Sequence, residues 1–229
     1  MGTIGSGGYF EFNPELIVEV TMVCDRACQG CYAPNLVSRG RAQAALARHP
    51  ELFLKPEVLS GRLSEIASSL KRQLTSLSFR GGEPTRHPEL PALIALSLRF
   101  TRRLFVETHG RWLLPGQDAG PEPGEALRVL ARQGVTVKVS FDSMHGTTAA
   151  ELKELLGRLD RQGVNWLVAI TEPDAESFLA RRELCGPVAD SKIVRQLKVA
   201  RASELYAPPL GVIRTDGAIL HSLSARRAF

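Results

Sequence analysis

The stretch LIVEVTMVCDRACQGCY, residues 16–32, joins a short apolar run directly to three closely spaced cysteines. Residues 16–20 are mostly apolar and rich in β-branched side chains, a combination typical of a buried strand. The cysteines Cys24, Cys28 and Cys31 are separated by three and by two residues. A strand that leads straight into a thiol-rich loop indicates metal or redox chemistry at one end of the strand.

Three close thiolates suit an iron–sulfur cluster. The small residues Ala27 and Gly30 lie between the cysteines and would let the chain fold around it. Three cysteines leave one iron of a [4Fe–4S] cluster without a protein ligand, and that iron can bind a substrate or cofactor. Other uses stay open: a zinc site completed by Cys185 or a histidine, a disulfide with one free thiol, or an electron-transfer cluster, which normally has four cysteines.

Short apolar runs alternate with longer amphipathic segments along the rest of the chain. Strands are predicted over residues 16–20, 74–79, 104–108, 135–141, 166–170 and 193–199, and helices over residues 55–70, 90–98, 125–132, 149–161 and 175–184. Such alternation predicts an α/β fold with parallel strands and helical crossovers. The pattern alone does not distinguish an open doubly wound sheet from a barrel.

The remaining segments predict one domain with a short tail. Residues 1–14 form a glycine-rich lead-in that we expect to be flexible, and residues 15–229 form the core domain. Residues 116–124 are rich in proline and glycine, which predicts a surface loop. Residues 211–220 contain Asp216-Gly217 between two short apolar runs, which predicts a β-hairpin.

Composition places the chain among globular proteins and gives a mild basic excess. The 229 residues are 44% hydrophobic, with no apolar run long enough to span a membrane and no secretory signal pattern, so we expect a cytoplasmic protein. The net charge of +5 would favour acidic partners such as RNA or an acidic peptide. An arginine-rich proteome would explain the same excess, because no basic segment carries the interleaved aromatic residues of single-strand binders.

A second motif follows the second predicted strand, which ends in Gly81-Gly82-Glu83-Pro84. Two glycines allow a sharp turn and a close approach of the backbone to a neighbour. Together, the C-x₃-C-x₂-C motif after the first strand and the Gly-Gly-Glu motif after the second resemble the radical S-adenosylmethionine (radical SAM) superfamily. The resemblance implies a partial (β/α)₆ barrel, to which the predicted hairpin adds a short C-terminal tail.

The resemblance also implies the two cofactors. A [4Fe–4S] cluster on the three cysteines would bind S-adenosylmethionine (SAM) through the open iron, and polar atoms of Gly81, Gly82, Glu83 and Pro84 would hold the SAM amino group. The reduced cluster would then cleave SAM to methionine and a 5′-deoxyadenosyl radical. One departure is Gly30, where the family usually has an aromatic residue, and we expect Tyr32 to pack against the adenine instead.

Later strand ends supply further candidates. The third strand ends in Glu107-Thr108-His109-Gly110, which resembles the family's Glu-Thr-Asn-Gly with His109 in place of asparagine. Thr108, and Ser140 and Asp142 after the fourth strand, are candidates to bind the ribose or the methionine carboxylate of SAM. The alternative for Ser140 and Asp142 is ordinary capping of a loop.

Two residues are candidates for catalysis. His109 lies at a predicted strand end, where an incidental loop histidine is the alternative. Cys185 could donate a hydrogen atom or form a thiyl radical, and the alternative is a small buried thiol in the core. With Cys185 as the single cysteine outside the motif, no cysteine-rich extension for auxiliary clusters is predicted.

The function predicted first is a radical SAM enzyme that abstracts hydrogen from a small metabolite, nucleoside-like or derived from an amino acid. The second is radical modification of a peptide, a protein glycyl position or RNA. A non-enzymatic iron–sulfur or zinc scaffold is the alternative from another class. The resemblance implies a flavodoxin- or ferredoxin-like electron donor as a partner.

Overall fold

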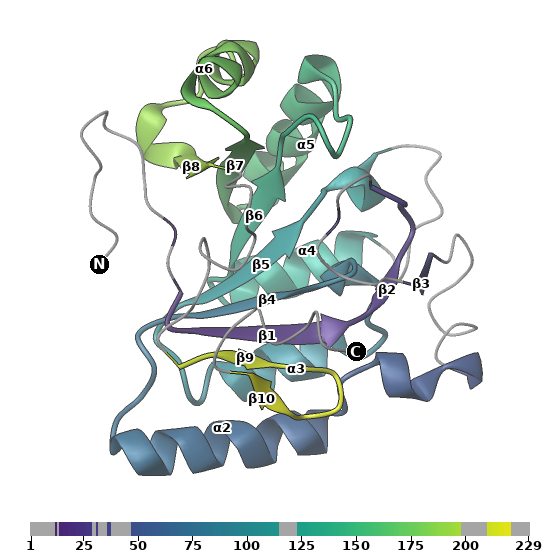
Figure 1. The fold of residues 1–229 in the computed structure, drawn as a ribbon, viewed down its shortest axis with the longest axis vertical. Coiled ribbons are helices and arrows are strands. Elements are labelled where there is room, and N and C mark those ends of the chain that lie inside the picture. The colour runs from purple at the N-terminus through teal and green to yellow at the C-terminus, as the bar shows by residue number, and fades with distance from the viewer. Residues whose placement is uncertain are drawn as a thin grey trace.

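The computed structural model describes residues 12, 14–28, 31, 36–37, 47–114, 123–197 and 210–220. The strands of its main sheet are β1 (Leu16–Thr21), β4 (Leu77–Gly81), β5 (Leu104–Thr108), β6 (Thr136–Ser140), β7 (Asn165–Glu172), β8 (Ile193–Leu197), β9 (Val212–Ile213) and β10 (Ile219–Leu220). They lie in the order β10-β9-β1-β4-β5-β6-β7-β8 (Figure 1). A separate pair, β2 (Val23–Cys24) and β3 (Leu36–Val37), runs parallel beside it.

The strand order decides between the two architectures that the sequence left open. From β1 through β4 to β8, every strand of the main sheet pairs in parallel with the next strand of that sheet along the chain. A doubly wound sheet would reverse its strand order at a switch point, whereas here the order runs in one direction. Within the described residues the two edges, β8 and β10, do not pair, so the sheet stays open. The predicted partial (β/α)₆ barrel is confirmed.

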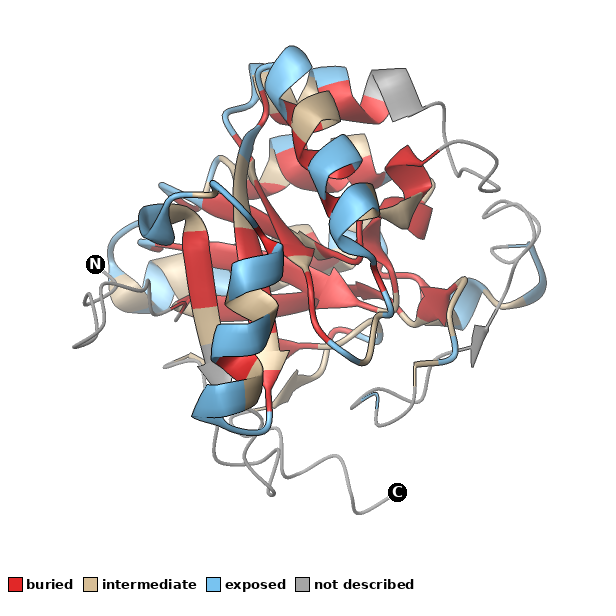
Figure 2. Cartoon of the chain, turned by 90° about the horizontal axis from the view of Figure 1, so that it is seen from above, coloured by how far each residue is buried: buried red, intermediate tan, exposed pale blue. Residues whose placement is uncertain are grey.

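The five long helices cover one face of this sheet. They are α2 (Pro56–Leu70), α3 (Leu90–Ser97), α4 (Pro123–Arg132), α5 (Ala149–Arg161) and α6 (Ala175–Leu184). One large apolar cluster joins buried leucines of α2, α3, α4 and α5, and Phe178 of α6, to every second residue of the parallel strands. Figure 2 shows the result, with buried strands at the centre and helices that expose their outer sides. This layering follows from connections that all cross on the same side.

Local sequence signals set the helix ends. Pro56 begins α2 at a position where its missing N–H costs nothing. Thr148 and Glu151 form a reciprocal capping box at the start of α5. After α4 and α5 the chain turns at Gly134 and Gly163, whose φ angles of 63° and 67° favour glycine.

The opposite face of the sheet is concave and carries a different chemistry. Ser78, Arg80, Glu107 and Lys138 lie on this inner face, because strand residues alternate in direction. Nζ of Lys138 lies 2.9 Å from a carboxylate oxygen of Glu107, and Ser78 donates a hydrogen bond of 2.6 Å to the other oxygen. The inner face therefore holds a buried ion pair instead of an apolar layer at this level.

An aromatic residue packs below this ion pair. Phe12, inside the segment predicted as a flexible lead-in, is buried and meets Phe105 edge to face at 5.0 Å. Its ring also lies 4.1 Å from Nζ of Lys138, and a small apolar cluster of Phe105, Ala169 and Val194 surrounds it. Residue 12 therefore belongs to the core of the concave face, while residues 1–11 and 13 lie outside the described part of the chain.

Most predicted boundaries hold, and the differences have physical reasons. The second strand begins at 77 instead of 74, because Leu74 makes only an isolated bridge to Thr101. The predicted hairpin is present, since β9 and β10 pair antiparallel. Its parallel pairing to β1 was not predicted. Residues 116–122 of the predicted loop and residues 198–199 of the last predicted strand lie outside the described residues.

Candidate functional site

Predicted site residues from several motifs lie at the carboxyl ends of four parallel strands. Cys24 follows β1, Glu83 follows β4, His109 follows β5 and Asp142 follows β6. Parallel α/β folds place their ligand sites at this edge, because the loops after each strand converge there. The sequence motifs, although scattered along the chain, therefore belong to one region.

The three motif cysteines form a gradient from the interior to the surface. Cys24 is buried, Cys28 is half-buried and Cys31 is exposed, and none of the three forms a disulfide. The backbone N–H of Cys31 donates to the carbonyl oxygen of Cys28 at 3.2 Å, so these two cysteines lie close together. The three cysteines thus lie in the stretch of chain that follows β1.

The surroundings of these thiols resist negative charge. Burial raises the pKa of Cys24 to about 12, and the neighbouring carboxylates of Glu83 and Asp25 add to the effect. Burial also raises the pKa of Cys28, against a hydrogen bond from Arg26. Thiolates at these positions need a compensating cation, which iron ions would supply. An all-thiol donor set in a short loop fits an iron–sulfur cluster.

Gly81 and Gly82 press the turn after β4 against the chain that leads into Cys24. A Cβ atom on Gly81 would lie 2.1 Å from the carbonyl oxygen of Thr21, and one on Gly82 would lie 2.2 Å from that of Val23. The N–H of Gly82 donates to Thr21 at 2.7 Å, and the N–H of Glu83 donates to Val23 at 2.9 Å. The close approach that the glycines allow is to the protein's own backbone.

The carboxylate of Glu83 is fully buried and receives its hydrogen bonds from the protein. Its Oε1 accepts from the Thr85 N–H at 3.2 Å, the Thr85 hydroxyl at 2.8 Å and the Thr108 hydroxyl at 2.7 Å. Its Oε2 accepts from the His109 N–H at 3.1 Å. Pro84 is also buried and begins the short 3₁₀ segment η2 (Pro84–Arg86). Glu83 therefore ties the turn after β4 to the end of β5.

Thr108 extends the same network. Besides donating to Glu83, its hydroxyl oxygen accepts from the Gly110 N–H at 3.0 Å and from Nε1 of Trp112 at 3.1 Å. Trp112 lies in the 3₁₀ segment η3 (Arg111–Leu113) and is buried. The side chain of Thr108 thus joins three parts of the strand-end loop.

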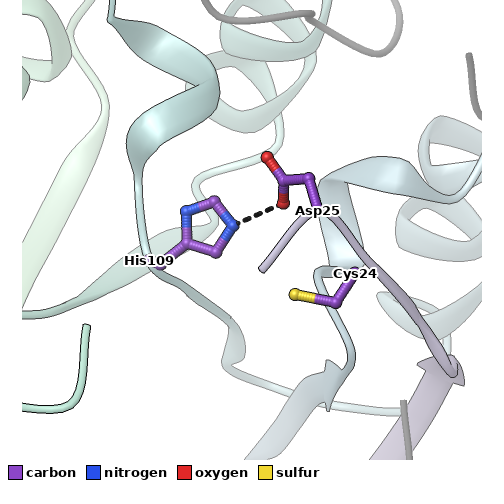
Figure 3. Close-up of side chains that lie close together, drawn as sticks. All are labelled: Cys24, Asp25 and His109. Atoms are coloured by element: carbon purple, nitrogen blue, oxygen red, sulfur yellow. Dashed lines mark hydrogen bonds and ion pairs between the residues drawn. The ribbon is translucent and has the colours of Figure 1, made fainter. Parts of the chain in front are cut away.

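A second network connects the cysteine loop to these turns (Figure 3). Oδ1 of Asp25 lies 2.9 Å from Nε2 of His109, and Oδ2 lies 3.0 Å from Nη2 of Arg86. Burial alone would raise the pKa of Asp25, but the hydrogen bonds from His109 and Arg86 and the charge of Arg86 hold it below its ordinary value. Asp25 is therefore ionised inside the cysteine motif.

Cys24, Asp25 and His109 also bring possible metal ligands within 4.8 Å of one another (Figure 3). The hydrogen bonds argue against a separate metal ion there. Nδ1 of His109 accepts from the N–H of Arg111 at 3.1 Å, so the ring carries its proton on Nε2 and donates it to carboxylate oxygen. Both imidazole nitrogens and both Asp25 oxygens are thereby used within the protein.

Asp25 and Arg86 are site residues that sequence reasoning missed. Asp25 lies between two of the cysteines, and Arg86 follows the Gly-Gly-Glu-Pro turn, so both positions flank motifs that were identified. The signal that could have found them is a charged residue next to a cluster of ligands. Their pairing could not be predicted, because it depends on how the turns pack.

The ends of β6 and β7 carry their own polar contacts. Asp142 is buried and accepts from the N–H of His145 at 3.0 Å and from its Nδ1 at 2.7 Å. Glu172 accepts from the N–H and hydroxyl of Ser143, at 3.0 and 2.9 Å. Ser140 is half-buried at the end of β6 and pairs with Ala169 of β7. These residues share the edge of the sheet with the cysteine loop.

One predicted residue, Cys185, lies away from this place, and the position of another, Tyr32, is not described. Cys185 is buried in the main core at the end of α6, and its Sγ lies 3.7 Å from the carbonyl oxygen of Arg181. Because α6 runs from the carboxyl end of β7 back to the start of β8, Cys185 lies toward the opposite edge of the sheet. Tyr32 lies outside the described residues, as do Gln29 and Gly30.

Comparisons with known proteins bear on the fold. No protein-family model and no curated protein sequence matches the chain. The crystal structure of Streptococcus suis SuiB bound to S-adenosylmethionine matches with a TM-score of 0.52 at 16% identity, over 84% of this chain and 43% of that one. SuiB bound to its precursor peptide SuiA matches with a TM-score of 0.51 at 16% identity, over 77% and 37%. The structure of BtrN in complex with AdoMet and 2-DOIA matches with a TM-score of 0.41 at 20% identity, over 93% and 75%.

Fold and site together define an open parallel α/β barrel with a cysteine loop at the carboxyl ends of its strands. The chain has the radical SAM fold. It spans about two fifths of the length of the SuiB chains that it matches. Among the described residues, no helix is both long and apolar enough to cross a membrane.

Proposed function

We propose that this protein is a radical SAM enzyme, with a [4Fe–4S] cluster on Cys24, Cys28 and Cys31. One observation carries the proposal. The loop with the three cysteines, none of which forms a disulfide, lies beside the Gly-Gly-Glu turn at the strand ends of a radical SAM fold. When bound, the cluster supplies the electron for reductive cleavage of SAM to methionine and a 5′-deoxyadenosyl radical. A flavodoxin- or ferredoxin-like protein would deliver that electron.

The chain's own residues would bind and orient SAM. Polar backbone atoms of the turn at Gly81 and Gly82 are proposed to hold the amino group, because the Glu83 carboxylate is already bonded to Thr85, Thr108 and His109. In this arrangement Glu83, Pro84 and Thr108 fix the shape of the turn. Ser140 and Asp142 would contact the ribose or the methionine carboxylate from β6. Tyr32 keeps its proposed role against the adenine.

The substrate follows from the rest of the concave face. We propose a small nucleoside-like or amino-acid-derived metabolite, since the ion pair of buried Lys138 and partly buried Glu107 gives that face polar groups. A peptide is the second candidate, supported by the likeness to the SuiB structure that holds a precursor peptide. RNA and a protein glycyl position are weaker alternatives. The alternative outside the enzymes is a scaffold protein that holds an iron–sulfur cluster or zinc without catalysis.

The test is reductive cleavage of SAM. The protein would be reconstituted anaerobically with iron and sulfide, given SAM and dithionite, and assayed for 5′-deoxyadenosine by liquid chromatography. Cys28→Ala should abolish product, whereas Cys185→Ala should retain it, because Cys185 lies away from the site. The pair of variants is matched, since each removes one thiol. If the parent protein binds a cluster or zinc and never cleaves SAM, the protein is a non-enzymatic scaffold.

A further inference from the structure

One charged residue inside the cysteine motif has partners on two other loops. Asp25 lies directly after Cys24, and its carboxylate receives Nη2 of Arg86 on one oxygen and Nε2 of His109 on the other. The side chains are 12%, 2% and 3% exposed, so water hardly screens these contacts. Asp25 therefore fastens the loop after β1 to the loops after β4 and β5.

The partners of Asp25 are themselves held in place. Nε2 of His109 also lies 3.1 Å from Oε2 of Glu83, and its Nδ1 accepts from the backbone N–H of Arg111. The ring is thus oriented from both sides, and only its Nε2–H can be offered to carboxylates. Arg86 belongs to η2, which begins at the Gly-Gly-Glu-Pro turn. Movement of Asp25 would require breaking contacts to two turns at once.

The network also places charged groups beside Cys24. The carboxylate of Asp25 directly follows Cys24 in the chain, and the guanidinium of Arg86 lies 3.0 Å from that carboxylate. A negative charge near an iron–sulfur centre disfavours addition of an electron, and its removal favours it.

We propose that Asp25, held by Arg86 and His109, is a positioning residue that fixes Cys24 for the cluster and sets the charge under which the cluster is reduced. This inference rests on the proposed function, because it concerns the cluster of that same site. The proposal gives a role to the ion pair of Asp25 and Arg86, which are not among the cysteines and glycines of the two motifs. The relevant step is the one-electron reduction of [4Fe–4S]²⁺ to [4Fe–4S]⁺ by dithionite.

The first arm of the test uses the full-length protein without iron. The rate at which iodoacetamide alkylates Cys24, followed by peptide mass spectrometry, should be low in the parent, because Cys24 is buried. Asp25→Asn and Arg86→Met should each raise that rate about tenfold or more, because each breaks the tie that keeps the loop closed. Cys31 is exposed and serves as the internal reference. Unchanged alkylation of Cys24 in both variants would overturn the positioning role.

The second arm measures the midpoint potential of the reconstituted cluster by dithionite titration followed by electron paramagnetic resonance. Asp25→Asn removes a negative charge and should raise the potential, whereas Arg86→Met removes a positive charge and should lower it. Asp190→Asn is the control, since Asp190 is exposed in the short 3₁₀ segment before β8, and the substitution should leave the potential unchanged. Shifts of the same sign in the two network variants, or no shift, would overturn the electrostatic role.

The two arms separate this inference from the proposed function. If the parent assembles no cluster, the proposed function fails, and the alkylation arm still decides whether Asp25 positions Cys24. If the parent cleaves SAM but neither arm responds, the inference fails and the proposed function stands. A network variant that assembles no cluster although it folds, with rapid alkylation of Cys24, supports the positioning role.

Discussion

Gly82 and Val23 are so close that a Cβ atom on Gly82 would lie 2.2 Å from the carbonyl oxygen of Val23. This oxygen belongs to the backbone of the residue before Cys24, so it cannot move away by a change of rotamer as a side chain could. The contact therefore excludes every residue except glycine from position 82, and it ties the Gly-Gly-Glu turn to the position of the first cysteine.

Gly82→Ala should destabilise the protein and displace the cysteine loop. We expect a loss of about 3 kcal/mol in the free energy of unfolding, since a rigid neighbour must shift. Gly61→Ala is the matched control, because nothing lies within 4 Å of a Cβ there and the site is inside α2. The control should be neutral or stabilising by up to about 1 kcal/mol. Urea denaturation of both variants measures this, and equal stabilities would refute the argument.

Thr108→Val should be costly although it preserves side-chain volume. The variant takes a donor from the buried Glu83 carboxylate and an acceptor from Nε1 of Trp112. Unpaired buried polar groups cost about 1–3 kcal/mol each, so we expect a loss of about 2–4 kcal/mol. Thr148→Ala, which removes only the exposed cap of α5, should cost about 1 kcal/mol. Thermal denaturation should rank the two variants in that order.

The buried ion pair of Lys138 and Glu107 should show strong coupling. Burial alone would raise the pKa of Glu107, but the charges of Lys138 and Arg80 hold it below its ordinary value. Lys138→Met or Glu107→Gln removes one member of this largely buried pair and should cost about 3–5 kcal/mol. The double variant should lose less than the sum of the two, which a double-mutant cycle in urea would measure. Simple additivity would show that the pair does not interact.

His87 should make the fold sensitive to acid. Burial lowers its pKa from 6.5 to about 4, against a hydrogen bond to the carbonyl oxygen of Leu54. The folded protein favours the neutral ring, so this contribution is present above pH 6.5 and is lost as the pH falls toward 4. The loss amounts to roughly 3 kcal/mol. His87→Gln should flatten the fall in unfolding free energy between pH 6.5 and 4, and an unchanged slope would place the acid sensitivity elsewhere.

Local signals explain why much of the fold could be predicted. Helix α5 begins at a capping box and ends before a glycine, so its bounds of 149–161 are encoded within the helix and its flanks. The strand at 104–108 is a short apolar run with clear polar borders. By contrast, β9 and β10 contribute two residues each, and their place beside β1 depends on contacts distant in the sequence. No local pattern contains that information.

The site residues also divide into those that a local sequence pattern predicts and those that depend on tertiary packing. Cys24, Cys28 and Cys31 could be identified because their chemistry depends on spacing along the chain. The partners of Asp25 could not, since His109 lies 84 positions away and the contact exists only after three turns have packed. Cys185 lies in the main core, whereas Tyr32 lies outside the described residues, so both roles stay predictions. Their proposed roles must be tested by substitution.

The pairing of β9 with β1 has a consequence for how the protein is made. Strand β1, which feeds the cysteine loop, gains one neighbour from β4 and the other from residues 212–213. During synthesis, its outer edge therefore stays uncovered until those residues have left the ribosome. An uncovered edge strand can pair with other chains, so a ribosome that stalls before residue 212 should release a product prone to aggregation.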